Sequence, residues 1–130
     1  MIKQKKVLII DDEEDFCFFV RENLLNTGMF DVFVATNGQH GIRLARSEKP
    51  DIVLLDLVMP DYPGEEVANI LSEDEATAQI PIIFVTALAT REDTDSSGLK
   101  KNGNAYFLSK PVRTRQLVYA IGEVLKESAN

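Results

Sequence analysis

Short apolar runs alternate along this chain with segments whose apolar residues recur every three or four positions. Val7–Ile10 is the first such run, and Ile52–Leu55 repeats it after Pro50. Unbroken runs of this length are typical of strands that are buried on both faces of a parallel sheet. In full, the predicted strands cover residues 7–10, 31–35, 52–55, 80–85 and 106–108.

The segments between these runs have the period of amphipathic helices. After the first run, one stripe contains Phe16, Phe19, Val20 and Leu24. This spacing predicts a helix that buries the stripe, while Cys17 and Phe18 lie off it and are expected to be partly exposed. Similar stripes predict helices around residues 42–45, 67–71 and 117–125.

Residues 89–102 form the least supported of the five predicted helices. Leu99 is the only large apolar residue in this segment, which also contains Ser96, Ser97 and Gly98. A helix with so little apolar surface would gain little from packing. We therefore expect this segment to be locally mobile.

Alternating strands and helices predict an α/β fold with a parallel sheet and helices on both faces. The 130 residues suit one domain, which we expect to span residues 1–130 without a linker or repeat. Apolar residues make up 45% and charged residues 27% of the chain, as in ordinary globular proteins.

Charge and cysteine usage narrow the possible partners and compartments. A net charge of -7 disfavours direct binding to nucleic acid or to acidic membranes. Cys17 is the only cysteine and His40 the only histidine, so no zinc site of the Cys/His type is expected. Met1–Lys6 resembles no signal peptide, and no membrane span is expected, so we predict a cytoplasmic protein.

Polar side chains follow four of the five predicted strands. Asp11 and Asp12 come after the first, Asp56 after the third, Thr86 after the fourth and Lys110 after the fifth. The carboxyl ends of parallel strands meet at one edge of the sheet, where such folds bind their ligands. We expect these five side chains to converge there.

Three converging carboxylates repel one another unless a cation neutralises them. Oxygen ligands and room for water favour Mg²⁺. Asp56 could then attack a phosphoryl group, while the cation and Lys110 balance the charge on its oxygens and Thr86 donates a hydrogen bond to them.

Taken together, these motifs resemble the receiver domains of two-component response regulators, a phosphoacceptor family that includes the chemotaxis regulators. The resemblance covers essentially the whole chain and implies a flavodoxin-like, doubly wound (βα)5 fold with strand order 2-1-3-4-5. Its markers are Asp11-Asp12, Asp56-x-x-Met59-Pro60-x-x-x-Gly64, Thr86-Ala87 and Lys110-Pro111.

The resemblance also implies roles for individual residues. Asp56 would be the phosphoacceptor, and Asp11, Asp12, Asp56 and the backbone carbonyl of Val58 would hold Mg²⁺. Lys110 would pair with the phosphoryl group, and Thr86 and Phe107 would form the switch pair. The peptide bond between Lys110 and Pro111 would be cis.

Two positions depart from the family in a way that affects kinetics. Val58 and Leu88, each two residues after a site residue, are apolar and cannot orient an attacking water. We therefore expect a long-lived phosphoryl group. Gly41 stands where alanine is common in the family.

The favoured function is a signalling switch that is not an enzyme in the usual sense. A histidine kinase or histidine phosphotransfer protein would phosphorylate Asp56, and the face after the fourth and fifth strands would change. The downstream protein or output domain, the cognate kinase and the oligomeric state are not predicted by the sequence. An aspartyl phosphohydrolase dependent on Mg²⁺ is the alternative, although Val58 replaces the second acid that such enzymes use. A nucleotide or flavin module is disfavoured because no glycine-rich loop follows the first strand.

Overall fold

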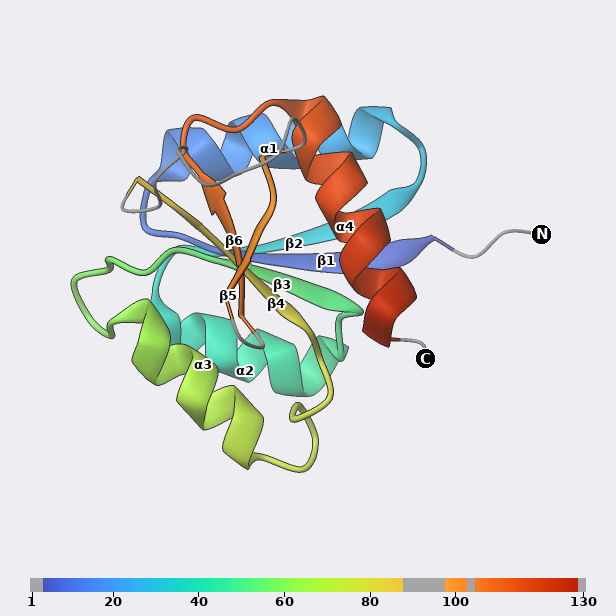
Figure 1. Ribbon diagram of the computed structural model, residues 1–130. Coiled ribbons are helices and arrows are strands. Elements are labelled where there is room, and N and C mark those ends of the chain that lie inside the picture. The colour runs from blue at the N-terminus through green and yellow to red at the C-terminus, as the bar shows by residue number, and fades with distance from the viewer. Residues whose placement is uncertain (1–3, 88–97, 103–104, 129–130) are drawn as a thin grey trace.

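A computed structural model describes residues 4–87, 98–102 and 105–128 of the chain. A twisted sheet lies between two layers of helices, with α1 and α4 on one face and α2 and α3 on the other (Figure 1). The strands are β1 Lys5–Ile10, β2 Phe30–Ala35, β3 Ile52–Leu55, β4 Ile82–Thr86, β5 Lys100–Asn102 and β6 Ala105–Ser109. The helices are α1 Glu14–Asn26, α2 Gly38–Glu48, α3 Gly64–Glu73 and α4 Thr114–Ser128.

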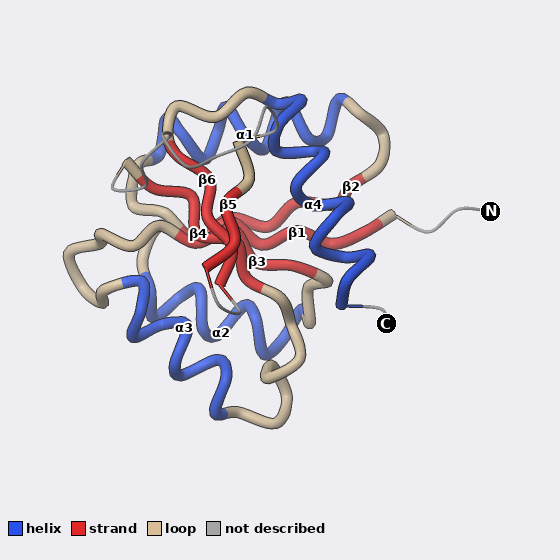
Figure 2. The backbone as a smooth tube through the Cα atoms, viewed as in Figure 1, coloured by secondary structure: helices blue, strands red, loops and turns tan. Residues whose placement is uncertain are grey.

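The strand order confirms the predicted topology and adds one strand to it. The sheet runs β2-β1-β3-β4-β6-β5, and the first five of these strands are parallel. The predicted order 2-1-3-4-5 is therefore present, with β6 in the place of the fifth strand. At the edge, β5 lies beside β6 (Figure 2). It pairs antiparallel with β6, which makes the sheet six-stranded and mixed.

Alternate residues of each central strand enter opposite cores, which explains why these strands are apolar throughout. Val7 and Ile9 pack under α1 and α4, whereas Leu8 and Ile10 pack under α2 and α3. Strand β3 divides its four residues in the same way, and all four are buried. The two helical layers thus rest on the two faces of a single set of strands.

Helix α1 turns a different face to the core from the one that its sequence predicts. Its buried residues are Cys17, Val20 and Leu24, while Phe19 is 50% exposed. At 100° per residue, Phe19 lies about 130° around the helix from the centre of the buried stripe. The sequence predicts a buried Phe19 and a partly exposed Cys17, and both predictions are wrong. They follow the spacing of the aromatic residues, whereas the helix buries the small thiol instead. Phe18 is exposed as expected.

The described part of the segment between β4 and β6 contains an element that the sequence did not predict. Residues 89–97 of the predicted fourth helix, with the mobility expected there, lie outside the described residues. The end of that prediction is wrong, because Lys100–Asn102 forms the short edge strand β5. Lysines on a three-residue edge strand discourage pairing with a further strand. Across the parts of the chain that are described, no helix is long and apolar enough to cross a membrane.

The phase of α1 can be tested by comparing two truncations in it. Leu24→Ala should lower the free energy of unfolding by about 2–5 kcal/mol, because it leaves a cavity in the core. Phe19→Ala should cost about 1 kcal/mol or less, because half of the ring already contacts water. Urea denaturation of both variants measures this, and equal losses would contradict the observed orientation of the helix.

Candidate functional site

Backbone hydrogen bonds hold the carboxyl ends of the parallel strands side by side. The Asp11 amide donates to the Ala35 carbonyl at 3.1 Å, and the Asp56 amide donates to the Ile10 carbonyl at 3.1 Å. The Lys110 amide donates to the Thr86 carbonyl at 3.0 Å. The hydrogen bonds of the sheet therefore continue to the first residues after the strands, and they fix the backbone positions of Asp11, Asp56 and Lys110.

Three carboxylates meet at this edge, as the sequence predicted. Asp11, Asp12 and Asp56 each offer an oxygen, and these oxygens lie within 4.8 Å of one another. Asp11 and Asp56 are buried, at 1% and 6% exposure, whereas Asp12 faces solvent. Burial raises the pKa of Asp11 above its usual range, although contact with Lys110 opposes this shift.

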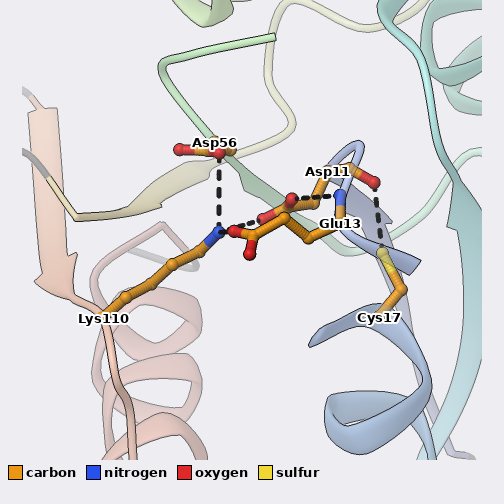
Figure 3. Close-up of polar contacts among 5 residues, drawn as sticks. All are labelled: Asp11, Glu13, Cys17, Asp56 and Lys110. Carbon is orange, nitrogen blue, oxygen red and sulfur yellow. Dashed lines mark hydrogen bonds and ion pairs between the residues drawn. The ribbon is translucent and has the colours of Figure 1, made fainter. Parts of the chain in front are cut away.

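Lys110 reaches into this group of carboxylates from the end of β6 (Figure 3). Its Nζ lies 2.8 Å from Asp11 Oδ2, 2.5 Å from Glu13 Oε1 and 3.5 Å from Asp56 Oδ2. The ammonium also lies 4.3 Å from the centre of the Phe16 ring. Burial disfavours the charged form of Lys110, but contacts with Asp11 and Glu13 raise its pKa above the usual range, so the ammonium stays charged.

The loop after β1 is fixed by contacts to both ends of Asp11. The Glu13 amide donates to Asp11 Oδ1 at 2.9 Å, and the buried Cys17 thiol donates to the Asp11 carbonyl at 3.2 Å. Burial, followed by the negative charge of Asp11, raises the pKa of Cys17 to about 12. The thiol is therefore a protonated donor at neutral pH and orients the first acid of the site.

The loop after Asp56 is held by the close approach of Gly64. The Gly64 amide donates to the Leu57 carbonyl at 2.8 Å. A Cβ at position 64 would lie 2.1 Å from the Asp56 carbonyl oxygen, so only glycine fits. Between these residues Met59 is buried and Val58 is 58% exposed.

Thr86 and Phe107 lie on the same face of the sheet. In the register of β4 and β6, Phe84 pairs with Phe107 and Thr86 pairs with Ser109. The rings of Phe84 and Phe107 stack, with centroids 5.3 Å apart. The hydroxyl of Thr86 is buried one strand away from the aromatic ring that the sequence analysis paired with it. The peptide bond between Lys110 and Pro111 is cis, as expected.

The donor set fits a divalent cation. Asp11 Oδ2 is buried and approaches Lys110, yet it has no well-directed hydrogen bond. Buried carboxylate charge is costly unless it is balanced, and the single ammonium near Asp11 is shared with Glu13 and Asp56. Two further carboxylates within reach, one of them open to water, match the oxygen ligands and partial hydration that Mg²⁺ prefers.

Comparison with known families agrees with this geometry. The model of the response regulator receiver domain matches residues 7–122, from the first buried strand to the last helix. The chain belongs to this family. A receiver domain is the phosphoacceptor switch of a two-component system, which confirms the function that the strand-end residues predicted.

Two curated relatives show how receiver domains of this kind occur. Protein PilH of Pseudomonas aeruginosa is 38% identical over 120 residues, which cover 92% of this chain and 97% of that protein. The alkaline phosphatase synthesis transcriptional regulatory protein PhoP of Bacillus subtilis is 32% identical, but the chain covers only 50% of its length. Similar domains thus occur both nearly alone and as part of a longer regulator.

A solved structure shares the fold. The CheY-like receiver domain of Methanospirillum hungatei superposes with a TM-score of 0.79 over 98% of both chains, at 24% identity. This likeness supports the fold of the described residues.

One contact of the site was not anticipated from the sequence. The Glu13 carboxylate touches the ammonium of Lys110. The two residues are 97 positions apart, so no local pattern could pair them. Its place directly after Asp11 and Asp12, in the loop that leaves β1, was the only available signal.

The close approach of Gly64 predicts a sharp difference between two glycine substitutions. Gly64→Ala should lower the free energy of unfolding by about 2 kcal/mol or more, because the added Cβ meets the backbone of Asp56. Gly122→Ala is the matched control: position 122 is open, so alanine should stabilise α4 by about 0.5–1 kcal/mol. Chemical denaturation of both variants measures the effects, and a neutral Gly64→Ala would contradict the packing of this loop.

Proposed function

We propose that Asp56 is the phosphoacceptor of this receiver domain. The observation that carries the proposal is its position: a buried carboxylate directly after β3, 3.5 Å from Lys110 and grouped with Asp11 and Asp12. A carboxylate oxygen can attack phosphorus, and the adjacent ammonium can balance the charge that develops there.

In the proposed reaction, an oxygen of Asp56 forms a bond to phosphorus while the bond from phosphorus to the donor breaks. The bonding electron pair leaves with the donor, as an imidazole nitrogen of a phosphohistidine or as the carboxylate of an acyl phosphate. Lys110 donates hydrogen bonds to the phosphoryl oxygens, and Thr86 contributes its hydroxyl. The protein that donates the phosphohistidine phosphoryl group would be a histidine kinase or a histidine phosphotransfer protein.

Mg²⁺ would be held by Asp11, Asp12, Asp56 and the carbonyl of Val58. When bound, it supplies positive charge for the phosphoryl oxygens. Lys110 alone cannot balance the carboxylates around it, since one ammonium already contacts three of them. The requirement for a cation follows from this excess of negative charge.

The output of the switch would arise at β4 and β6. On phosphorylation, the single carboxylate charge of Asp56 is replaced by a phosphate that carries about -1.5 to -2 and three acceptor oxygens, which would draw the Thr86 hydroxyl toward Asp56. Phe107 lies on the same face one strand away and is partly buried against Phe84. Movement of Thr86 would give this ring a second position and so alter the face after these strands.

The remaining assignments concern context. We propose that residues 1–130 form a single receiver domain, that it acts in the cytoplasm, and that it catalyses only its own phosphorylation and dephosphorylation. Its output would pass to a separate protein or to an attached output domain. The phosphohydrolase alternative is disfavoured because Val58 occupies the position of the second acid.

Replacing the acceptor tests the assignment directly. Incubated with Mg²⁺ and an acyl phosphate, the unmodified chain should gain one phosphoryl group, seen by intact mass spectrometry. Asp56→Asn should gain none, because the amide is not a comparable nucleophile. Incorporation at the unmodified level in Asp56→Asn would refute the proposal, and many turnovers with release of phosphate would favour a phosphohydrolase.

The side chain at position 58 should control the lifetime of the phosphoryl group. Val58 lies two residues after Asp56, is 58% exposed and offers no hydrogen bond to a water. We expect slow loss of phosphate from the unmodified chain and a half-life several-fold shorter in Val58→Asn, measured after removal of the donor. An equal half-life for Val58→Asn and the control Val58→Leu would contradict this. The second apolar position, Leu88, lies outside the described residues.

A further inference from the structure

Lys110 has three carboxylate partners, and one of them lies outside the cation-binding group. Asp11 and Asp56 belong to that group, together with Asp12. Glu13 does not, yet its Oε1 approaches the ammonium at 2.5 Å, whereas Asp56 Oδ2 lies at 3.5 Å. The nearest acceptor for the ammonium is thus a residue with no assigned role (Figure 3).

Among the described residues, Lys110 is the hydrogen-bond and ion-pair partner of the Glu13 side chain. Glu13 precedes α1, but its side chain makes no capping hydrogen bond to the helix. The Glu13 side chain is 61% exposed, so it approaches the largely buried ammonium of Lys110 from the solvent side. A substitution here should leave the fold intact.

We propose that Glu13 is a positioning residue that acts as an electrostatic latch on Lys110, competing with Asp56 for the ammonium until a phosphoryl group displaces the Glu13 carboxylate. The inference rests on the proposed role of Asp56 as acceptor. It adds a residue that controls how readily Asp56 is phosphorylated.

Competition for a limited number of donors is the physical basis of the latch. The Lys110 ammonium has three N–H groups, and the carboxylates of Asp11, Glu13 and Asp56 already surround it, with the face of Phe16 beside them. For Lys110 to bind phosphoryl oxygens, at least one of these contacts must weaken. Asp11 is almost fully buried and held by the Glu13 amide, whereas the Glu13 carboxylate is free to swing into water. Glu13 is therefore the partner whose release costs least.

The latch works against phosphorylation in two ways. A carboxylate hydrogen-bonded to the ammonium lowers the positive potential that an anionic donor meets. It also stabilises the unphosphorylated arrangement, which lowers the affinity for any group that needs Lys110. Removing the charge of Glu13 should therefore favour both phosphorylation and binding of a phosphoryl mimic.

The test compares Glu13→Gln with Glu14→Gln. Both variants lose one negative charge at the start of α1, but Glu14 has no ion pair to Lys110, so it reports the general effect of charge on an anionic donor. Two quantities are measured with Mg²⁺ present: the initial rate of phosphorylation by an acyl phosphate, and the dissociation constant for beryllofluoride. Relative to Glu14→Gln, Glu13→Gln should improve both by about three- to tenfold, the range for a charge-assisted contact that is half in solvent.

Two further readouts separate a latch from a merely structural effect. The advantage of Glu13→Gln should shrink toward unity as salt rises to about 1 M, because exposed charge pairs are screened. Without any metal, the Nζ resonance of Lys110 in ¹⁵N NMR spectra should shift in Glu13→Gln and stay in place in Glu14→Gln.

Each outcome decides between specific claims. Equal rates and affinities for the two variants, or slower phosphorylation of Glu13→Gln, would overturn the latch. If Asp56→Asn still incorporated phosphoryl in the same assay, the proposed acceptor would fail instead. An inert Asp56→Asn together with no gain in Glu13→Gln would remove the latch alone.

Discussion

The ammonium of Lys110 is the interaction on which the site depends. It lies among three carboxylates at the edge of the sheet, within 2.8 Å of Asp11, 2.5 Å of Glu13 and 3.5 Å of Asp56. Without it, two buried carboxylates would repel each other in a poorly hydrated space. One positive charge is still too little for this cluster. The remaining negative charge attracts a divalent cation, and the cation and lysine together suit a phosphoryl group.

The parallel sheet makes this concentration of charge possible. Strands buried on both faces must be apolar along their length, so polar side chains are excluded until each strand ends. Because β1, β3, β4 and β6 are parallel and in register, their ends share one edge. Backbone hydrogen bonds from Asp56 to Ile10 and from Lys110 to Thr86 bind these ends together. The free energy of folding of the sheet thus offsets the repulsion between the carboxylates at its edge.

The same register links the charged edge to the rest of the molecule. Thr86 ends β4, and Phe84 and Phe107 stack on the same face two residues earlier in their strands. A change of charge at Asp56 therefore acts within one strand of a stacked aromatic pair. Glu13 lies on the other side of Lys110 and competes for the same ammonium. Glu13 thus controls the phosphorylation of Asp56 through Lys110, whereas Thr86 and Phe107 respond to it.

The sequence by itself determined the periodic elements, the parallel topology and the identities of the strand-end residues. These depend on local patterns: a strand buried on both faces must be an apolar run, and Asp11, Asp56, Thr86 and Lys110 mark where such runs stop. Only the tertiary structure decided which face of α1 is buried, because Cys17 and Phe19 compete for a space whose shape other elements set. It also formed β5 from a polar segment that gains its hydrogen bonds from β6, and it brought Glu13 to Lys110 across 97 positions. Such contacts depend on the geometry of the assembled sheet, and no local pattern of residues records them.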